Sequence, residues 1–282
     1  MLLIADSGST KTQWAIAVQG KPTEEFSSGG LNPSLMSDAE FTDAVRAALA
    51  ESGESDFDGV FFYGAGCTPS RAVKVREILA DLTGCGNVEV GSDMLGAARG
   101  LCGNSEGVVG ILGTGSNSCR YNGRDIVANT PPLGYVLGDE GSGARLGISL
   151  VNGILKGYLP EDLQRVFYES TGLDKDEIIR RVYREPAANR FLASFTRFIA
   201  ETIARPEIES LVTEEFSRFF SNNVTRAYGA VRVIHFVGSI AEVFKPQLMA
   251  AASIHHLKVG KVVSRPLPLI VDYHLQTSFN CC

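Results

Sequence analysis

A short pattern that occurs twice constrains the fold of this chain more than any other feature. Residues 2–18 read as a strand, a loop rich in Gly, Ser and Thr, and a second strand, and residues 108–121 follow the same order. The loops are Asp6-Ser7-Gly8-Ser9-Thr10-Lys11-Thr12 and Gly113-Thr114-Gly115-Ser116-Asn117. Few residues are identical between them, but the order of elements is shared. The repetition predicts two equivalent α/β halves with a cleft between them, where ligands commonly bind.

The composition of the loops suggests what they bind. Thirty of the 282 residues are glycine, about 11% against a typical 7%. Glycine lets backbone N–H groups approach a phosphate closely, and Ser or Thr hydroxyls add donors. Neither loop is a Walker sequence or a dinucleotide fingerprint, because a strand follows each one instead of a helix. An ordinary hairpin turn is the alternative for either loop alone, whereas the pair predicts a clamp on a polyphosphate.

Charge and hydropathy exclude several classes of partner. The chain has 26 Lys and Arg against 32 Asp and Glu, a net charge of −6, which argues against nucleic acid and anionic membranes. No apolar run approaches the roughly 18 residues of a membrane helix, and we expect no secretory signal at the N-terminus. We therefore expect a cytoplasmic protein with reduced thiols. The six cysteines are Cys67, Cys85, Cys102, Cys119, Cys281 and Cys282.

Helix and strand signals fill out each half. A capping box at Ser37–Glu40 predicts a helix over 38–51, and Thr68-Pro69 predicts another that ends at Gly84. Asp93 follows a short strand at 88–90. The pattern is largely helical from about 139 to 228, and strands are expected again at 231–237 and, with prolines, over 259–273.

Four motifs, in this order along the chain, resemble those of the N-acetylglucosamine kinase and BadF/BadG-type ATPase family, within the actin-like ATPase superfamily. They are Asp6–Thr12, Gly113–Asn117, Gly138-Asp-Glu-Gly-Ser-Gly143 and Val237-Gly-Ser-Ile-Ala241. The resemblance covers essentially the whole chain. It implies an α/β fold of two actin-like (ribonuclease H-like) lobes with mixed five-stranded sheets around an interdomain cleft. The lobes would be 1–104, completed by a segment near 270–282, and 105–269, which carries a helical insertion.

The resemblance also implies roles for residues at matching positions. Asp93 would be the catalytic base and would face the sugar, and Asp6 would hold Mg²⁺, largely through water. The sugar would be bound by Asn32, Asp93, Asn117 and Asp139. The implied ATP-binding residues are Asp6, Gly8, Ser9, Thr10, Lys11, Gly113, Thr114, Gly115, Ser116, Gly238, Ser239 and Ala241.

Physical chemistry agrees with these roles but leaves alternatives for the acidic residues. Phosphoryl transfer needs a magnesium site, backbone donors and a residue that orients the attacking hydroxyl. A carboxylate at Asp93 could accept the proton of a sugar hydroxyl, or it could simply cap the helix that follows. Asp139 and Glu140 could lie at a helix N-terminus for electrostatic reasons alone. Asp6 ends a buried strand, where a carboxylate is costly without a metal or another partner.

The sequence thus predicts an ATP- and Mg²⁺-dependent kinase that phosphorylates the 6-hydroxyl of an amino sugar, with N-acetylglucosamine as the first choice. Its partners would be the sugar and ATP, and a homodimer is left open. The alternatives are a BadF/BadG-type ATPase that activates another enzyme and a non-enzymatic sensor of ATP or sugar. One segment departs from the sugar-kinase pattern, since Pro131-Pro132-Leu133-Gly134-Tyr135 stands where relatives often have Gly-Gly-Trp-Gly.

Overall fold

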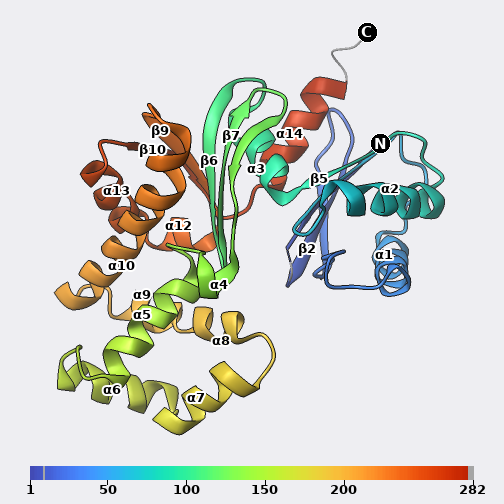
Figure 1. The fold of residues 1–282 in the computed structure, drawn as a ribbon. Coiled ribbons are helices and arrows are strands. Elements are labelled where there is room, and N and C mark those ends of the chain that lie inside the picture. The colour runs from blue at the N-terminus through green and yellow to red at the C-terminus, as the bar shows by residue number, and fades with distance from the viewer. Residues whose placement is uncertain (9, 279–282) are drawn as a thin grey trace. The chain divides into compact units, whose positions relative to one another are not determined.

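The computed structural model describes residues 1–8 and 10–278 (Figure 1). Their contacts divide the chain into two units. Unit 1 comprises Met1–Glu106, Tyr121–Ile126 and the chain from Arg265 onward, and unit 2 comprises Gly107–Arg120 and Val127–Ser264. The predicted ranges place residues 121–126 in the second lobe, whereas their contacts assign them to unit 1. Each unit contains a five-stranded sheet with helices, which confirms the predicted fold class.

The sheet of unit 1 has the strand order β3-β2-β1-β4-β5. Its central strand β1 pairs antiparallel with β2 and parallel with β4, so the sheet is mixed. The strands are β1 (Leu2–Ser7), β2 (Lys11–Ala17), β3 (Glu24–Gly29), β4 (Gly59–Gly64) and β5 (Val88–Ser92). The helices are α1 (Asp38–Ser52), α2 (Pro69–Thr83), α3 (Asp93–Cys102) and α14 (Leu267–Ser278).

Both faces of this sheet are covered, as the alternation of side chains along β1 shows. Leu3 and Ala5 belong to the hydrophobic cluster that includes the buried residues of α1 and α2. Leu2 and Ile4 point to the opposite face, in a cluster that includes residues of α14. Helices α3 and α14 lie side by side (Figure 1). Asp6 continues the alternation of Leu2 and Ile4 and therefore belongs to the α3 and α14 face.

The sheet of unit 2 has the strand order β10-β9-β6-β7-β8. Its strands are β6 (Glu106–Leu112), β7 (Ser116–Asn122), β8 (Ile126–Thr130), β9 (Val233–Val237) and β10 (Lys258–Val263). The short helices are α4 (Gly134–Leu137), α8 (Ala188–Ser194), α9 (Thr196–Glu201), α11 (Arg226–Tyr228) and α12 (Ser239–Val243). The longer ones are α5 (Gly143–Leu155), α6 (Glu161–Thr171), α7 (Lys175–Arg184), α10 (Pro206–Phe219) and α13 (Lys245–Ile254).

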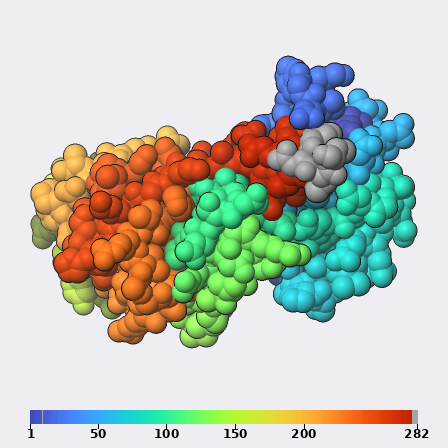
Figure 2. Space-filling model, turned by 90° about the horizontal axis from the view of Figure 1, so that it is seen from above, coloured from blue at the N-terminus to red at the C-terminus, as the bar shows by residue number. Residues whose placement is uncertain are grey.

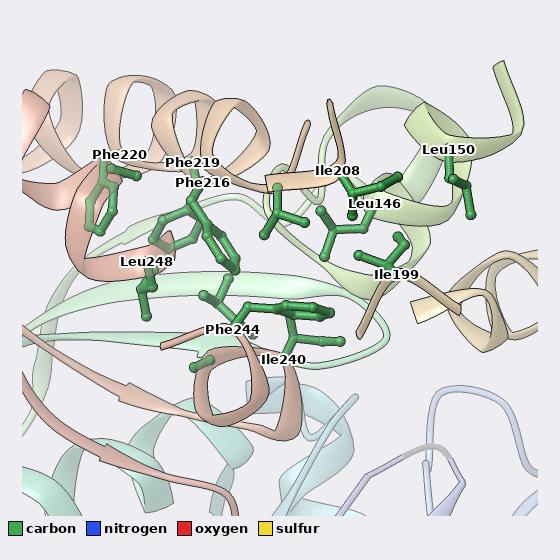
Figure 3. Packing of buried hydrophobic residues seen from close by; sticks show 14 of the residues in the cluster. Leu146, Leu150, Ile199, Ile208, Phe216, Phe219, Phe220, Ile240, Phe244 and Leu248 are labelled. Atoms are coloured by element: carbon green, nitrogen blue, oxygen red, sulfur yellow. The ribbon is translucent and has the colours of Figure 1, made fainter. Parts of the chain in front are cut away.

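Aromatic and aliphatic side chains pack together in the core of unit 2 (Figure 3). Phe216 and Phe219 are on α10, and Phe220 begins the π-helical turn η1 (Phe220–Thr225). None of the three side chains is exposed to solvent. The rings of Phe219 and Phe236 lie 5.9 Å apart, which ties α10 to strand β9. Burying a side chain of this size contributes roughly 2–3 kcal/mol, so this contact holds the helical insertion on the sheet.

The segment 259–273 is where the predicted secondary structure is wrong. A strand does occur at β10, but residues from Leu267 onward form the helix α14. The run Leu267–Val271 is apolar and suggests a strand, yet its buried residues Leu267, Ile270 and Val271 follow the i, i+3, i+4 spacing of a helix. Pro268 lies in the first turn, where a missing N–H costs nothing.

His274 of α14 links the C-terminal helix to the sheet of unit 1. Its ring stacks on Phe61 with 3.7 Å between centroids, and Nε2 shares a 2.8 Å hydrogen bond with the Tyr63 hydroxyl. Burial, followed by the charge of Arg99, lowers the pKa of His274 to about 3. The segment that carries this helix also lies against the N-terminal part of the chain, where Arg265 pairs with Glu25 at 2.7 Å (Figure 2).

We expect this buried histidine to make the protein less stable in acid. The unfolded chain binds a proton near pH 6.5 and the folded one near pH 3, so stability is fully present above pH 6.5 and falls between the two values. The loss is at most about 1.4 kcal/mol per pH unit. Denaturant unfolding at pH 6.5 and 4.5 should show a shallower pH dependence for His274→Gln than for the wild type. Equal slopes would contradict the assignment.

Within the described residues, no helix is both long enough and apolar enough to cross a membrane. None of the four described cysteines forms a disulfide. Cys281 and Cys282 lie outside the described residues.

Candidate active site

Asp6, near the end of β1, and Asp93, directly after β5, are close enough to interact electrostatically. Asp6 is the fifth residue of β1, and Asp93 is the first residue of α3. Burial and then the charge of Asp93 raise the pKa of Asp6 to about 7. Burial also raises the pKa of Asp93, against hydrogen bonds from backbone N–H groups, including that of Met94 at 2.9 Å. The structure therefore brings together the predicted metal-binding residue and the predicted base.

Asp93 is not the N-cap of helix α3. The N-cap of α3 is Ser92, whose hydroxyl accepts the N–H of Leu95 at 3.2 Å. Asp93 is thus not needed as the cap, although a carboxylate in the first turn is also favoured by the helix dipole. Its charge also raises the pKa of Asp6, and two carboxylates that interact unfavourably in this way favour a chemical role.

The first glycine loop is a tight hairpin between β1 and β2. The N–H of Gly8 donates to the carbonyl of Lys11 at 3.0 Å, and the hydroxyls of Ser7 and Thr12 are 2.7 Å apart at its base. Gly8, Thr10 and Lys11 are exposed at the tip of this hairpin. Ser9, the remaining predicted phosphate-binding residue of this loop, lies outside the described residues.

The second loop joins β6 to β7 in unit 2 and is held by helix α5. The N–H groups of Gly143 and Ala144 donate to the carbonyls of Gly113 (2.8 Å) and Thr114 (3.1 Å). Within the loop, the N–H of Gly113 donates to the carbonyl of Gly115 at 3.0 Å. The Gly138–Gly143 motif thus supports the predicted phosphate loop, since α5 begins at the end of that motif.

Asp139 supports the same loop from another side, in a way that the sequence did not reveal. Its carboxylate accepts a hydrogen bond from the backbone of Ser116. A Cβ atom at Gly115 would lie 3.0 Å from its Oδ2, a tight contact, so this carboxylate lies directly against the loop. Asp139 has a φ of 57°, a strained value for a non-glycine residue that is often found at functional sites. Burial and Glu140 raise the pKa of Asp139, while Ser116 and Arg145 act against them.

The other predicted sugar-binding residues lie in both units. Asn32 follows β3 in unit 1, and its Oδ1 accepts the N–H of Ser34 at 3.0 Å. Asn117 is on β7 in unit 2, where its Oδ1 accepts from the N–H of Ser118 (2.8 Å) and from Nδ2 of Asn129 (2.9 Å). The contacts of these residues with a sugar stay predictions.

The predicted adenosine motif forms the turn from β9 into α12. Gly238 has a φ of 123°, and a Cβ atom there would collide with the carbonyl oxygen of Leu112. Ser239 opens α12 and is exposed, whereas Ala241 is fully buried in the core of unit 2. The motif therefore packs directly on the strand that leads into the second glycine loop, and the place of Ala241 near adenosine stays a prediction.

Gly238→Ala should damage unit 2 and the second glycine loop together. The added methyl group cannot be accommodated without moving the end of β6, and φ at this position is strained for alanine. We expect a loss of roughly 2–4 kcal/mol in unfolding free energy. Thermal denaturation can be compared with that of Gly86→Ala, whose Cβ atom would meet no atom within 4 Å. Equal melting temperatures for the two variants would contradict the prediction.

Magnesium fits the donors at this site. No cluster of three or more His, Cys, Asp or Glu side chains that could hold a metal occurs among the described residues. Mg²⁺ usually needs no such cage, because it keeps several waters and is bound by one or two carboxylates together with substrate phosphates. The raised pKa of Asp6 marks a carboxylate whose charge is poorly compensated, and a divalent cation would compensate it.

Comparisons with known proteins support the family and the fold. No family model matches the sequence. A solved structure of a candidate N-acetylglucosamine kinase from Porphyromonas gingivalis is 45% identical, with a TM-score of 0.94 over 99% of this chain and 100% of that one. A ROK family glucokinase from Streptomyces griseus, solved with glucose and AMPPNP, shares the fold at 12% identity, with a TM-score of 0.55 over 96% of this chain and 97% of that one.

A curated relative is more distant in sequence. The N-acetylmuramic acid/N-acetylglucosamine kinase of Clostridium acetobutylicum is 26% identical over 153 residues, which are 52% of this chain. The match spans about half of that relative, 49% of its length.

Proposed function

Because the chain belongs to the N-acetylglucosamine kinase family, we propose that it transfers the γ-phosphate of ATP to the 6-hydroxyl of N-acetylglucosamine. The observation that carries this proposal is the pair of adjacent carboxylates, Asp6 and Asp93. Transfer of a phosphoryl group to a hydroxyl requires compensation of the phosphate charge and a group that orients the hydroxyl. A binding protein that only senses ATP or sugar needs no such pair.

Asp93 acts as the general base. It accepts the proton of the 6-hydroxyl as the oxygen attacks the γ-phosphorus, and the bond between the γ-phosphorus and the bridging oxygen of ADP breaks. Burial raises the pKa of Asp93, which makes its carboxylate a stronger proton acceptor than an exposed aspartate. The hydrogen bonds that its carboxylate accepts from backbone N–H groups, including that of Met94, keep it oriented at the start of α3.

The remaining residues bind ATP and position the sugar. Asp6 holds Mg²⁺, which supplies charge neutralisation for the β- and γ-phosphates when it is bound. Backbone N–H groups of the two glycine loops bind phosphate oxygens, Gly238 and Ser239 border the adenosine, and Asn32, Asn117 and Asp139 bind sugar hydroxyls. Backbone amides and a cation explain how a chain of net charge −6 can bind a polyanionic nucleotide. A reaction that consumes ATP is consistent with the predicted cytoplasmic location, and the homodimer stays a prediction.

A panel of acceptors tests this function. ADP release should be measured with ATP, Mg²⁺ and, one at a time, glucose, glucosamine, N-acetylglucosamine, N-acetylmannosamine and N-acetylmuramic acid. We expect the highest kcat/KM with N-acetylglucosamine and almost no ADP release without sugar. Equal ADP release with and without every sugar would instead indicate an ATPase and would overturn the proposal.

A further inference from the structure

The segment that carries Asn32 is a loop, and its position is fixed from several directions. It runs from the end of β3 to the capping box that begins α1. We propose that Arg71, on α2, is a positioning residue for the sugar, because it fixes this loop and with it the amide of Asn32. The inference rests on the proposed function, in which Asn32 binds a sugar hydroxyl.

The guanidinium of Arg71 holds the C-terminal side of the loop through three donors. Nε donates to the carbonyl of Pro33 at 2.8 Å, and Nη2 donates to the carbonyl of Met36 at 3.1 Å. Nη1 lies 3.2 Å from the carboxylate of Asp38, the first residue of α1. Charge-assisted hydrogen bonds to carbonyls are stronger than neutral ones, and the planar fork makes all three at once. Arg71 therefore holds the residues that follow Asn32 in place against α2.

The N-terminal side of the loop is fixed to the first glycine hairpin. The N–H of Leu31 lies 3.1 Å from both Ser7 Oγ and Thr12 Oγ1, and the Ser7 hydroxyl donates to the carbonyl of Leu31 at 3.0 Å. Asn32 therefore lies between a neighbour attached to the phosphate hairpin and a neighbour attached to Arg71. With both flanking residues held, its side chain has one backbone position from which to meet a sugar.

Gly66, in the turn after β4, completes the arrangement. Its φ is +80°, and a Cβ atom there would collide with Oδ1 of Asn32. Ser34 joins the two segments, since its hydroxyl donates to the carbonyl of Gly66 at 2.8 Å and its N–H donates to Oδ1 of Asn32 at 3.0 Å. The amide of Asn32 therefore lies directly against the backbone of the turn between β4 and α2. Arg71 is on α2, the helix that follows this turn.

Kinetics separates a positioning role from a purely structural one. If Arg71 holds Asn32 for the sugar, Arg71→Ala should raise KM for N-acetylglucosamine by about tenfold or more, since each lost or misplaced hydrogen bond weakens binding severalfold. The KM for ATP and kcat at saturating sugar should stay within about twofold of the wild type, because Asp6 and Asp93 are untouched. If Arg71 only supported the fold, the variant would lose active protein, and both KM values would be unchanged.

The experiment uses the full chain with Arg71→Ala, Arg71→Lys and Ser34→Ala, and with Arg46→Ala as the matched control. Arg46 lies on α1, is 60% exposed and pairs with the exposed Asp43 on the same helix. Both substrates are varied separately, and the melting temperature is recorded. We expect the KM for the sugar to stay high in Arg71→Lys, because one ammonium group cannot reach three acceptors. We also expect a severalfold rise in this KM with Ser34→Ala.

Two results would overturn the inference alone, and a third would overturn it together with the proposed function. An unchanged KM for the sugar in Arg71→Ala, with an active wild type, would refute the positioning role alone. A KM for the sugar in Arg71→Lys equal to that of the wild type would show that a positive charge alone positions the loop. It would refute the role of the planar guanidinium. If the wild type phosphorylates none of the sugars, the proposed function fails first and the inference fails with it.

Discussion

Asp93→Asn should lower kcat by roughly a thousandfold while the enzyme still binds ATP. The amide is isosteric with the carboxylate but cannot accept the proton of the sugar hydroxyl, and general-base catalysis is typically worth 10²–10⁴-fold. Helix α3 should be unaffected, because Ser92 is its cap. The measurement is steady-state turnover together with the dissociation constant of a nonhydrolysable ATP analogue.

The matched control for this variant is Asp43→Asn, an exposed substitution on α1 of the same unit. Its turnover should equal that of the wild type within about twofold, since exposed ion pairs contribute little. Undiminished turnover in Asp93→Asn would refute the assignment of the base. A loss of ATP binding as large as the loss of turnover would show instead that Asp93 acts through the nucleotide.

Asp6→Asn should stabilise the nucleotide-free protein while it removes activity. Asp6 has a pKa of about 7 in the folded chain against 3.8 as the ordinary value. Such a group favours the fold most below pH 3.8, and this contribution is lost as the pH rises through 7. At pH 8 the buried charge costs about 2–4 kcal/mol, which the amide does not incur.

Denaturant unfolding without nucleotide checks this expectation. The variant should be more stable than the wild type at pH 8, and the difference should shrink to about 1 kcal/mol or less near pH 4, where Asp6 is protonated in the folded chain and close to its ordinary pKa of 3.8 in the unfolded one. Its activity with ATP and Mg²⁺ should be lost, because a neutral amide is a poor magnesium ligand. A variant that is less stable than the wild type at pH 8 would show that the Asp6 carboxylate already has a compensating partner.

Local signals in the sequence predicted most of the first unit. The capping box at Ser37 and Glu40 is present with both of its hydrogen bonds, and Thr68 caps α2 as expected. The helix α14 was missed, because an apolar run with β-branched residues has the composition of a strand, and its helical periodicity becomes clear only when the buried positions are known.

The supporting contacts of the candidate site could not be predicted from the sequence for another reason. Asp6 and Asp93 could be proposed from their motifs, but the effect of the Asp93 charge on the pKa of Asp6 depends on a fold that brings together residues 87 positions apart. The Asp139 carboxylate accepts a hydrogen bond from the backbone of Ser116, and Asp139 has a positive φ. An aspartate in the sequence does not by itself predict this conformation. Arg71 likewise belongs to no motif, and only the arrangement of α2 beside the loop reveals its three acceptors.

The most direct test of the proposed activity is the identity of the product. The purified protein should be incubated with ATP, Mg²⁺ and N-acetylglucosamine, and the mixture followed by ³¹P NMR with proton coupling. We expect one phosphomonoester, coupled to the two protons on carbon 6, that appears in equal amount to ADP. Phosphate released as the free ion, or a phosphoryl group on any other hydroxyl, would contradict the proposal.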